Sequence, residues 1–277
     1  MSVRRLRLDA ELVRRGLARS REHAAELIAD GRVSVQGQRA TKPATGVTTD
    51  ADLVVKADPD KPDYVSRGGH KLAGALAAFA PAGLTVAGRR CLDAGASTGG
   101  FTDVLLRAGA TEVVAVDVGY GQLAWSLQSD ERVSVHDRTN IRELTTDLIG
   151  DPVDVVVGDL SFISLRLVLD ALIGVTRADG DLVLMVKPQF EVGKDRLGKG
   201  GVVRDPAHRA EVVLQIAEAA AARGWGAVGV AVSPLPGPSG NVEFFLWLRH
   251  GAPRIGEAEI STEVSRSSAA QAAGERL

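Results

Sequence analysis

Seven short apolar runs alternate with helical segments in the second part of this 277-residue chain, and this alternation restricts the fold more than any other feature. The runs are RRCLDAG, TEVVAVDVG, RVSVHDR, VDVVVGDLS, DLVLMVKP, AVGVAVSP and VEFFLWLRH. Several are continuous Val and Leu runs, which are typical of strands buried on both faces of a parallel sheet. The alternation therefore predicts a doubly wound α/β fold with a seven-stranded sheet.

A glycine-rich turn, LDAGASTGGFT, follows the first of these runs. The apolar run ends at Asp93, the turn contains Gly95, Gly99 and Gly100, and a helical pattern begins at Phe101. A strand followed by a tight turn and the start of a helix commonly forms the binding site of a nucleotide-like ligand. The class of nucleotide then depends on the spacing within the turn.

This spacing argues against two ligand classes. Phe101 stands where a P-loop has its phosphate-binding lysine, and the glycines do not follow the G-x-G-x-x-G order of dinucleotide sites. S-adenosylmethionine has no phosphate and needs only a turn against which its methionine part can lie. Asp117 lies 22 residues after Gly95, at the expected place of a ribose-binding acid, and Asp137 ends the third strand, near the expected adenine. Either acid alone could equally be a turn residue.

The sequence thus predicts S-adenosylmethionine as the cofactor. The candidate residues of its site are Asp93, Gly95, Ser97, Gly99, Gly100, Phe101, Asp117 and Asp137.

Four charged residues stand at or near the ends of apolar segments. Asp159 and Lys187 each follow an apolar run, Glu243 interrupts one, and Lys71 lies in the first turn of the helix that enters the domain. Because the carboxyl ends of parallel strands line the ligand crevice, we expect these side chains to converge beside the cofactor. Taken singly, each could instead belong to a structural ion pair.

Charge is distributed unevenly along the chain. Residues 1–42 contain ten Lys and Arg against five Asp and Glu, which gives +5, so the remainder carries −7 of the overall −2. Such an asymmetry indicates a polyanion-binding segment. The single Cys91 excludes a disulfide framework and a multi-cysteine zinc site, and it fits a reducing cytoplasm. No apolar stretch approaches the roughly 18 residues of a membrane span.

The basic segment RLDAELVRRGLARSREHAAELIADGRVSVQGQRATKP resembles an S4 RNA-binding domain. Helical apolar spacing and a short alternating segment predict a helix pair on a small sheet over residues 4–58, and a proline- and charge-rich stretch predicts a linker at 59–66. The α/β domain then spans 67–250, and the small polar residues at 251–277 predict a loose tail. S4 modules bind structured RNA through basic side chains. Further basic residues stand at the start of the α/β domain and in a glycine-rich loop after Lys187. The candidate RNA-binding residues are Arg4, Arg7, Arg14, Arg19, Arg21, Arg67, Lys194 and Lys199.

The four charged residues resemble the K-D-K-E tetrad of FtsJ-like ribose 2′-O-methyltransferases. Together with the S4 segment, the motifs SRGGHKL, LDAGASTGGFT, DVGYGQLAW, DLSFISL, VKPQFEVGK, GGVVRD and PGPSGNVEFF resemble the TlyA family. Members of that family are named both as haemolysins and as ribosomal RNA methyltransferases. The resemblance implies a Rossmann-like class I methyltransferase fold, and Lys71, Asp159, Lys187 and Glu243 as the catalytic residues, with no metal. Lys187 would lie nearest the 2′-oxygen, Asp159 would orient Lys187, and Glu243 would pair with Lys71.

The same resemblance implies methylation of cytidines in 16S ribosomal RNA, and in 23S ribosomal RNA as a second substrate, within the 30S and 50S subunits. Loss of this methylation is linked in the family to resistance to cyclic peptide antibiotics. A cytoplasmic protein without stable membrane attachment is expected. Two alternatives remain open at this point: a membrane-active haemolysin, and a small-molecule methyltransferase. The oligomeric state does not follow from the sequence.

Overall fold

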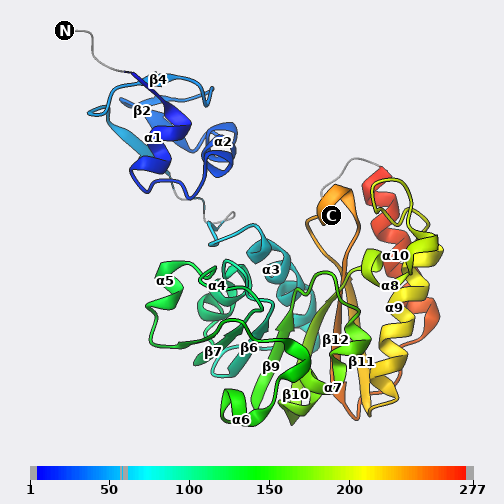
Figure 1. Ribbon diagram of the computed structural model, residues 1–277. Helices are drawn as coiled ribbons and strands as arrows, with labels where there is room; N and C mark the ends of the chain where they lie inside the picture. The colour runs from blue at the N-terminus through cyan, green and yellow to red at the C-terminus, as the bar shows by residue number, and fades with distance from the viewer. Residues whose placement is uncertain (1–4, 57, 59–61, 273–277) are drawn as a thin grey trace. The chain divides into compact units, whose positions relative to one another are not determined.

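The computed structural model describes residues 5–56, 58 and 62–272, and these divide into two compact units, 1–63 and 64–277. Unit 1 has two helices and two small sheets (Figure 1). Its elements are β1 (Leu6–Arg7), α1 (Leu8–Arg14), α2 (Arg21–Ala29), β2 (Val33–Val35), β3 (Gln38–Arg39), β4 (Gly46–Val47) and β5 (Leu53–Val55). Strand β2 pairs with β3 and β5, and β1 pairs with β4.

The helices of unit 1 form because each presents an apolar stripe to a shared core. Leu8 and Leu12 of α1 are fully buried against Leu27 and Ile28 of α2. Ser20 caps α2, since its side chain accepts a hydrogen bond from the backbone N–H of His23. The expected helix pair on a small sheet is therefore present.

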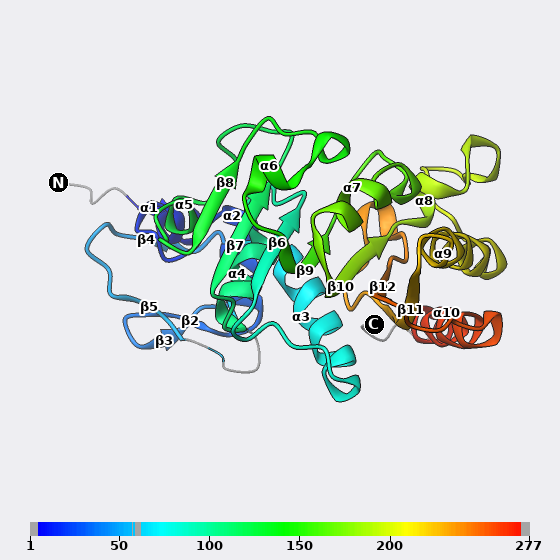
Figure 2. The ribbon, with the colours of Figure 1, turned by 90° about the horizontal axis from the view of Figure 1, so that it is seen from below.

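Unit 2 contains one seven-stranded sheet, in the order β11-β12-β10-β9-β6-β7-β8 (Figures 1 and 2). Its strands are β6 (Arg90–Ala94), β7 (Glu112–Val116), β8 (Val133–His136), β9 (Val153–Gly158), β10 (Thr176–Val186), β11 (Trp225–Val232) and β12 (Phe244–His250). All seven predicted strands are confirmed. The sheet is parallel except for β12, which runs antiparallel to both β10 and β11.

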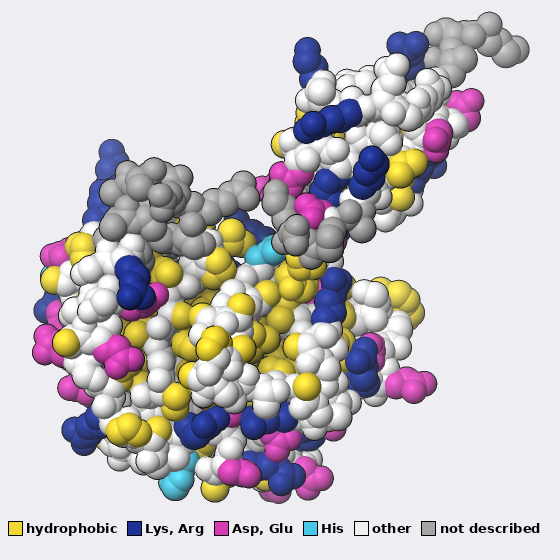
Figure 3. Space-filling model, turned by 180° about the vertical axis from the view of Figure 1, so that it is seen from behind, with side chains coloured by type: hydrophobic (Ala, Val, Ile, Leu, Met, Phe, Trp, Pro, Cys, Tyr) yellow, Lys and Arg dark blue, Asp and Glu magenta, His cyan; other side chains and the backbone are white. Residues whose placement is uncertain are grey.

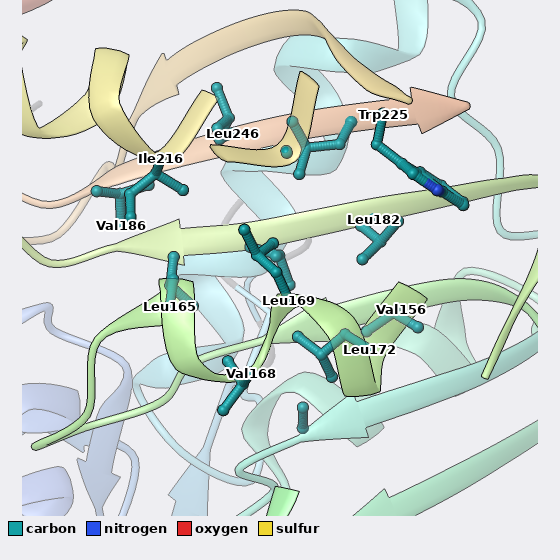
Figure 4. Packing of buried hydrophobic residues seen from close by; sticks show 14 of the residues in the cluster. Val156, Leu165, Val168, Leu169, Leu172, Leu182, Val186, Ile216, Trp225 and Leu246 are labelled. Atoms are coloured by element: carbon teal, nitrogen blue, oxygen red, sulfur yellow. The ribbon is translucent and has the colours of Figure 1, made fainter. Parts of the chain in front are cut away.

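Helices cover both faces of this sheet. The main helices are α3 (Gly68–Phe79), α4 (Gly100–Arg107), α7 (Leu169–Gly174), α9 (Pro206–Ala221) and α10 (Glu257–Ala272). Short α-helices in the connecting loops are α5 (Trp125–Gln128), α6 (Thr146–Ile149) and α8 (Pro188–Glu191). Short 3₁₀ helices are η1 (Ala80–Ala82), η2 (Ile141–Glu143), η3 (Leu165–Leu167), η4 (Lys194–Arg196) and η5 (Pro238–Gly240). Side chains of α7, α9 and α10 pack on one face of the sheet, and Figure 4 shows Leu169, Leu172, Leu182 and Ile216 among the buried side chains of this core. Helices α3 and α4 pack on the other face.

The expectation of a loose tail after residue 250 is wrong for most of that segment. Helix α10 packs on α9 and β11, with Ile260 and Val264 completely buried. Glu263 accepts a hydrogen bond from the backbone N–H of Val232 at 3.2 Å. An apolar pair spaced i, i+4 was the available sequence signal, and the small polar residues around it obscured that signal.

Two residues of the predicted linker, 59–66, make contacts that attach them to the two units. Asp63 belongs to unit 1, where its carboxylate binds Arg32 at 2.9 Å and His23 at 3.0 Å. Val65 belongs to unit 2, because its backbone N–H donates to Asp103 Oδ2 at 2.9 Å.

Candidate active site

A cavity of about 300 Å³ lies in unit 2 at the carboxyl ends of the strands. The start of α3 supplies Ser66, Arg67, Gly68 and Lys71, and the glycine turn with α4 supplies Gly95, Ala96, Ser97, Thr98, Gly100 and Phe101. The remaining lining residues are Asp159, Lys187 and Pro238. Residues from across the sequence therefore meet at the edge where the topology predicts a ligand crevice.

The glycines of the turn are required by close packing within the protein. Gly95 has a φ of +86°, and a Cβ there would approach the carbonyl oxygen of Asp159 to 3.0 Å. A Cβ on Gly100 would lie 2.3 Å from Ser66 Oγ and 2.9 Å from the backbone nitrogen of Gly69. The turn is thus packed against α3 and against the loop of Asp159, so the turn and the charged residues form adjoining walls of the same cavity.

Replacing Gly100 by alanine should displace the start of α3, which forms one wall of the cavity. Overpacking of this kind costs about 1–3 kcal/mol, and if the whole cost falls on the bound state, S-adenosylmethionine should bind about five- to 150-fold more weakly. Calorimetric titration with S-adenosylmethionine measures the effect. Gly174→Ala is the matched control, since Gly174 lies in α7 and a Cβ added there would meet no atom within 4 Å. Equal donor affinity in the two variants would contradict the prediction.

The predicted cofactor acids take different positions. Asp117 follows β7, and its oxygens accept backbone hydrogen bonds from Ser97 at 2.8 Å and Gly119 at 2.7 Å, so it lies against the glycine turn. Asp137 follows β8 and accepts a hydrogen bond from the backbone N–H of Gly121 at 2.7 Å. Both follow strand ends, but only Asp117 contacts the glycine turn, and neither lines the cavity itself.

Asp93 differs from the expectation of a direct ligand contact. Its side chain is completely buried beneath the turn, and its Oδ2 accepts a hydrogen bond from Thr102 Oγ1 at 2.7 Å. Burial raises the pKa of Asp93 to about 7. Asp93 therefore links β6 to α4 beneath the turn, because Asp93 lies near the end of β6 and Thr102 lies in the first turn of α4.

The raised pKa of Asp93 predicts a pH dependence of stability. The folded carboxyl binds its proton more tightly than the unfolded one, so its contribution is fully present below pH 3.8 and is lost as the pH rises to about 7. Asn does not titrate, and the free energy of unfolding of Asp93→Asn should fall less than that of the wild type across this window. Urea denaturation at a series of pH values measures the free energy of unfolding of both proteins. Parallel curves for the two proteins would rule out this linkage.

The four predicted catalytic residues form two ion pairs. Lys187 Nζ lies 2.5 Å from Asp159 Oδ1, and Lys71 Nζ lies 2.6 Å from Glu243 Oε2. Glu243 has no exposed surface, and the two lysines are each 6% exposed. Glu243 directly precedes β12 and does not lie inside the strand as expected. Lys71, Asp159 and Lys187 all line the cavity, so two cations are held next to the glycine turn.

Three further residues of this site carry no role in the sequence-based prediction. Ser161 Oγ accepts a hydrogen bond from Lys187 Nζ at 2.8 Å, and Gln189 Nε2 donates to Glu243 Oε1 at 3.0 Å. Phe162 is 91% exposed, has a φ of +64°, and its ring lies 5.0 Å from that of Phe190. Ser161 and Phe162 lie in the SFISL motif, whereas the partnership of Gln189 with Glu243 depends on the pairing of β10 with β12.

The candidate RNA-binding residues are divided between the units. Arg7, Arg14, Arg19 and Arg21 lie on the exposed surface of unit 1, where Figure 3 shows Lys and Arg side chains at several places. In unit 2, Arg67 lines the cavity and Lys199 is exposed in the loop after η4. Arg4 lies outside the described residues, and Lys194 is described only by its backbone, in η4. No helix in the described part of the chain is long and apolar enough to cross a membrane.

Comparison with known proteins assigns families to both units. The FtsJ-like methyltransferase model matches residues 64–250, and the S4 domain model matches residues 6–53. The 16S/23S rRNA (cytidine-2′-O)-methyltransferase TlyA of Mycobacterium tuberculosis is 63% identical over 247 residues, which are 89% of this chain and 91% of that protein. Hemolysin A of Brachyspira hyodysenteriae is 35% identical over 240 residues, 86% of this chain and 98% of that protein.

Among solved structures, a protein of Streptococcus thermophilus named as a hemolysin superposes with a TM-score of 0.74 at 35% identity. The match covers 99% of this chain and all of that one. The predicted family and fold class are thereby confirmed. From the match of unit 2 and the full-length relatives, this chain is a member of the TlyA family of FtsJ-like methyltransferases, with an S4 domain at its N-terminal side.

Proposed function

We propose that this protein transfers a methyl group from S-adenosylmethionine to the ribose 2′-hydroxyl of cytidines in ribosomal RNA. The observation that carries the proposal is the pair of buried lysine–carboxylate contacts, Lys187–Asp159 and Lys71–Glu243, beside the glycine-turn cavity. The Mycobacterium tuberculosis relative, whose name states this reaction on 16S and 23S rRNA, supports it.

The residues of the cavity fit S-adenosylmethionine. Gly100 and Phe101 begin α4 and line the cavity, and the first backbone N–H groups of a helix have no partner within it. These groups can donate to the carboxylate of the methionine part. Asp117 stands at the neighbouring strand end, where a carboxylate can accept hydrogen bonds from ribose hydroxyls. When bound, the donor supplies an electrophilic methyl group on its sulfonium.

The two lysines can supply the proton acceptor and the positive charge that a reacting 2′-hydroxyl needs. This hydroxyl is a weak acid and a poor nucleophile, so it must lose its proton as it attacks, and the developing negative charge must be stabilised. Lys187 Nζ is fixed by Asp159 and Ser161 and its side chain lines the cavity, so we assign both tasks to Lys187. Lys71 adds a second positive charge, which Glu243 and Gln189 hold in place.

The RNA would be held by both units. Arg7, Arg14, Arg19 and Arg21 of unit 1 offer guanidinium groups to phosphates, and Arg67, Lys194 and Lys199 are the candidates in unit 2. Phe162, exposed and directly after Ser161, offers an aromatic face on which an unstacked base can lie near Lys187. The proposed substrates are the 30S and 50S subunits, with the protein in the cytoplasm and its activity affecting sensitivity to cyclic peptide antibiotics.

Transfer of labelled methyl groups from S-adenosylmethionine to unmethylated 30S and 50S subunits tests the proposal. Nucleoside mass spectrometry should detect 2′-O-methylcytidine. Absence of transfer to either subunit, from protein that binds the donor, would overturn the ribosomal assignment. Transfer to small molecules alone would favour a small-molecule methyltransferase, and lysis of red cells without any transfer would favour the haemolysin alternative.

A further inference from the structure

Two buried carboxylates on α1 of unit 1 each hold two arginines. Asp9 is only 4% exposed, and its Oδ2 lies 2.9 Å from Arg7 Nη2 and 3.0 Å from Arg21 Nη2. Its Oδ1 accepts a further hydrogen bond from Arg7 Nε at 3.1 Å. One carboxylate thus brings together guanidinium groups from β1 and from α2, whose side chains remain 51% and 59% exposed.

The second carboxylate, Glu11, has no exposed surface and binds Arg14 at 2.6 Å and Arg15 at 2.8 Å. These two arginines differ in their other contacts. Arg15 also donates to the carbonyl oxygens of Ala51 and Thr49 and is 23% exposed, so it holds the fold together. Arg14 is 55% exposed and presents its guanidinium to solvent. The arrangement at Asp9 differs, because both of its arginines face outward.

Asp9 leaves much of each guanidinium available. An arginine has five N–H donors, and Asp9 uses those on Nε and one on Nη2 of Arg7 and of Arg21. The Nη1 donors are not used by Asp9. Two such groups fixed side by side match the several oxygens of a phosphate, which guanidinium forks bind in a two-pronged manner.

We propose that Asp9 is a positioning residue for RNA binding, which fixes Arg7 and Arg21 as a preformed pair for the phosphate oxygens of the RNA backbone. This inference rests on the proposed function and adds an acidic residue to its RNA-binding surface. The Arg7 guanidinium, together with Arg21, holds the pKa of Asp9 below its usual range, so the contact persists at neutral pH.

The proposal predicts that removing the negative charge of Asp9 weakens RNA binding, whereas the change in net charge alone would strengthen it. Removing a negative charge from an RNA-binding unit should strengthen binding if only the overall charge matters. If Asp9 fixes the two arginines, its loss leaves two long side chains that must be ordered when RNA binds. Asp9→Asn should then weaken binding although it makes unit 1 more positive.

The experiment compares the full-length wild type with Asp9→Asn and Glu22→Gln, using unmethylated 50S subunits as the probe over a series of salt concentrations. Glu22 is exposed on α2, so its variant makes the same charge change without touching the pair. Asp9→Asn should bind about tenfold more weakly, as expected when two side chains lose their preorganisation, with an unchanged slope of log K against log salt. Arg7→Ala should lower that slope by about one, and Glu22→Gln should bind no more weakly than the wild type.

Binding of Asp9→Asn as tight as that of the wild type, or tighter, would overturn the inference while leaving the proposed function intact. Thermal unfolding establishes whether the variant is folded. If it is not, Arg7→Lys/Arg21→Lys decides, because lysine keeps the charge but lacks the two-pronged fork. Wild-type affinity in that double variant would also overturn the inference. A wild type that does not bind the subunits would instead contradict the proposed function, and the inference with it.

Discussion

Lys187→Ala is expected to lower the rate of methyl transfer to ribosomal subunits about a thousandfold, within the range attributed to a positioned proton-transfer group. The physical reason is the location of its Nζ. Lys187 lines the cavity, and its Nζ lies 2.5 Å from Asp159 Oδ1 and 2.8 Å from Ser161 Oγ. In the proposed function, this fixed amine is the group that meets the attacking 2′-oxygen. Quenched-flow measurement of labelled methyl transfer under single-turnover conditions gives the rate of the chemical step.

Two controls separate the chemistry of Lys187 from its charge. Lys187→Arg keeps the positive charge, but arginine does not release its proton, so this variant should be nearly as slow as Lys187→Ala. Arg223→Ala removes a cation beyond the end of α9, where the guanidinium binds the exposed Asp170, and should leave the rate unchanged. Donor affinity should stay within about threefold of the wild type in all three, a difference well below 1.4 kcal/mol. Wild-type rates in Lys187→Ala would remove Lys187 from the mechanism.

The strands and the charged residues were predictable because their signal is local. Each strand is a continuous apolar run, and Asp159 and Lys187 stand directly after two such runs, at an edge that parallel topology makes common. The order of the strands was not predictable in this way. Insertion of β12 between β10 and β11, antiparallel to both, depends on contacts between distant segments that no periodicity records.

The same distinction explains the parts of the site that were missed. Gln189 gains its role only because β12 lies beside β10 and brings Glu243 within 3.0 Å of its amide. The Asp93 carboxylate stood in the expected motif, yet its direction, down toward Thr102 and away from the cavity, is set by how α4 packs on β6. The sequence indicates which residues lie near a site, whereas the direction of each side chain depends on tertiary packing.

Lys71→Met is expected to destabilise the protein by about 3–5 kcal/mol, the cost of leaving a buried charge without its partner. Glu243 has no exposed surface, and its Oε2 accepts from Lys71 Nζ at 2.6 Å, so loss of the lysine leaves Gln189 as the described donor to this carboxylate. A change of this size should lower the Tm by about 10 °C for a domain of this length. Differential scanning calorimetry measures it, and Arg223→Met, which removes a cation from an exposed pair, should change the Tm little.

The double variant Lys71→Met/Glu243→Met separates the structural contribution of this pair from its contribution to the reaction. Replacing both charges removes the unpaired carboxylate, and exchanging a buried ion pair for hydrophobic side chains of similar volume is often neutral or stabilising. The Tm should therefore return close to that of the wild type, while methyl transfer stays low because the second positive charge beside the cavity is gone. Recovery of transfer together with stability would mean that Lys71 and Glu243 serve only the fold. Failure of both to recover would mean that the two residues do not act as a pair.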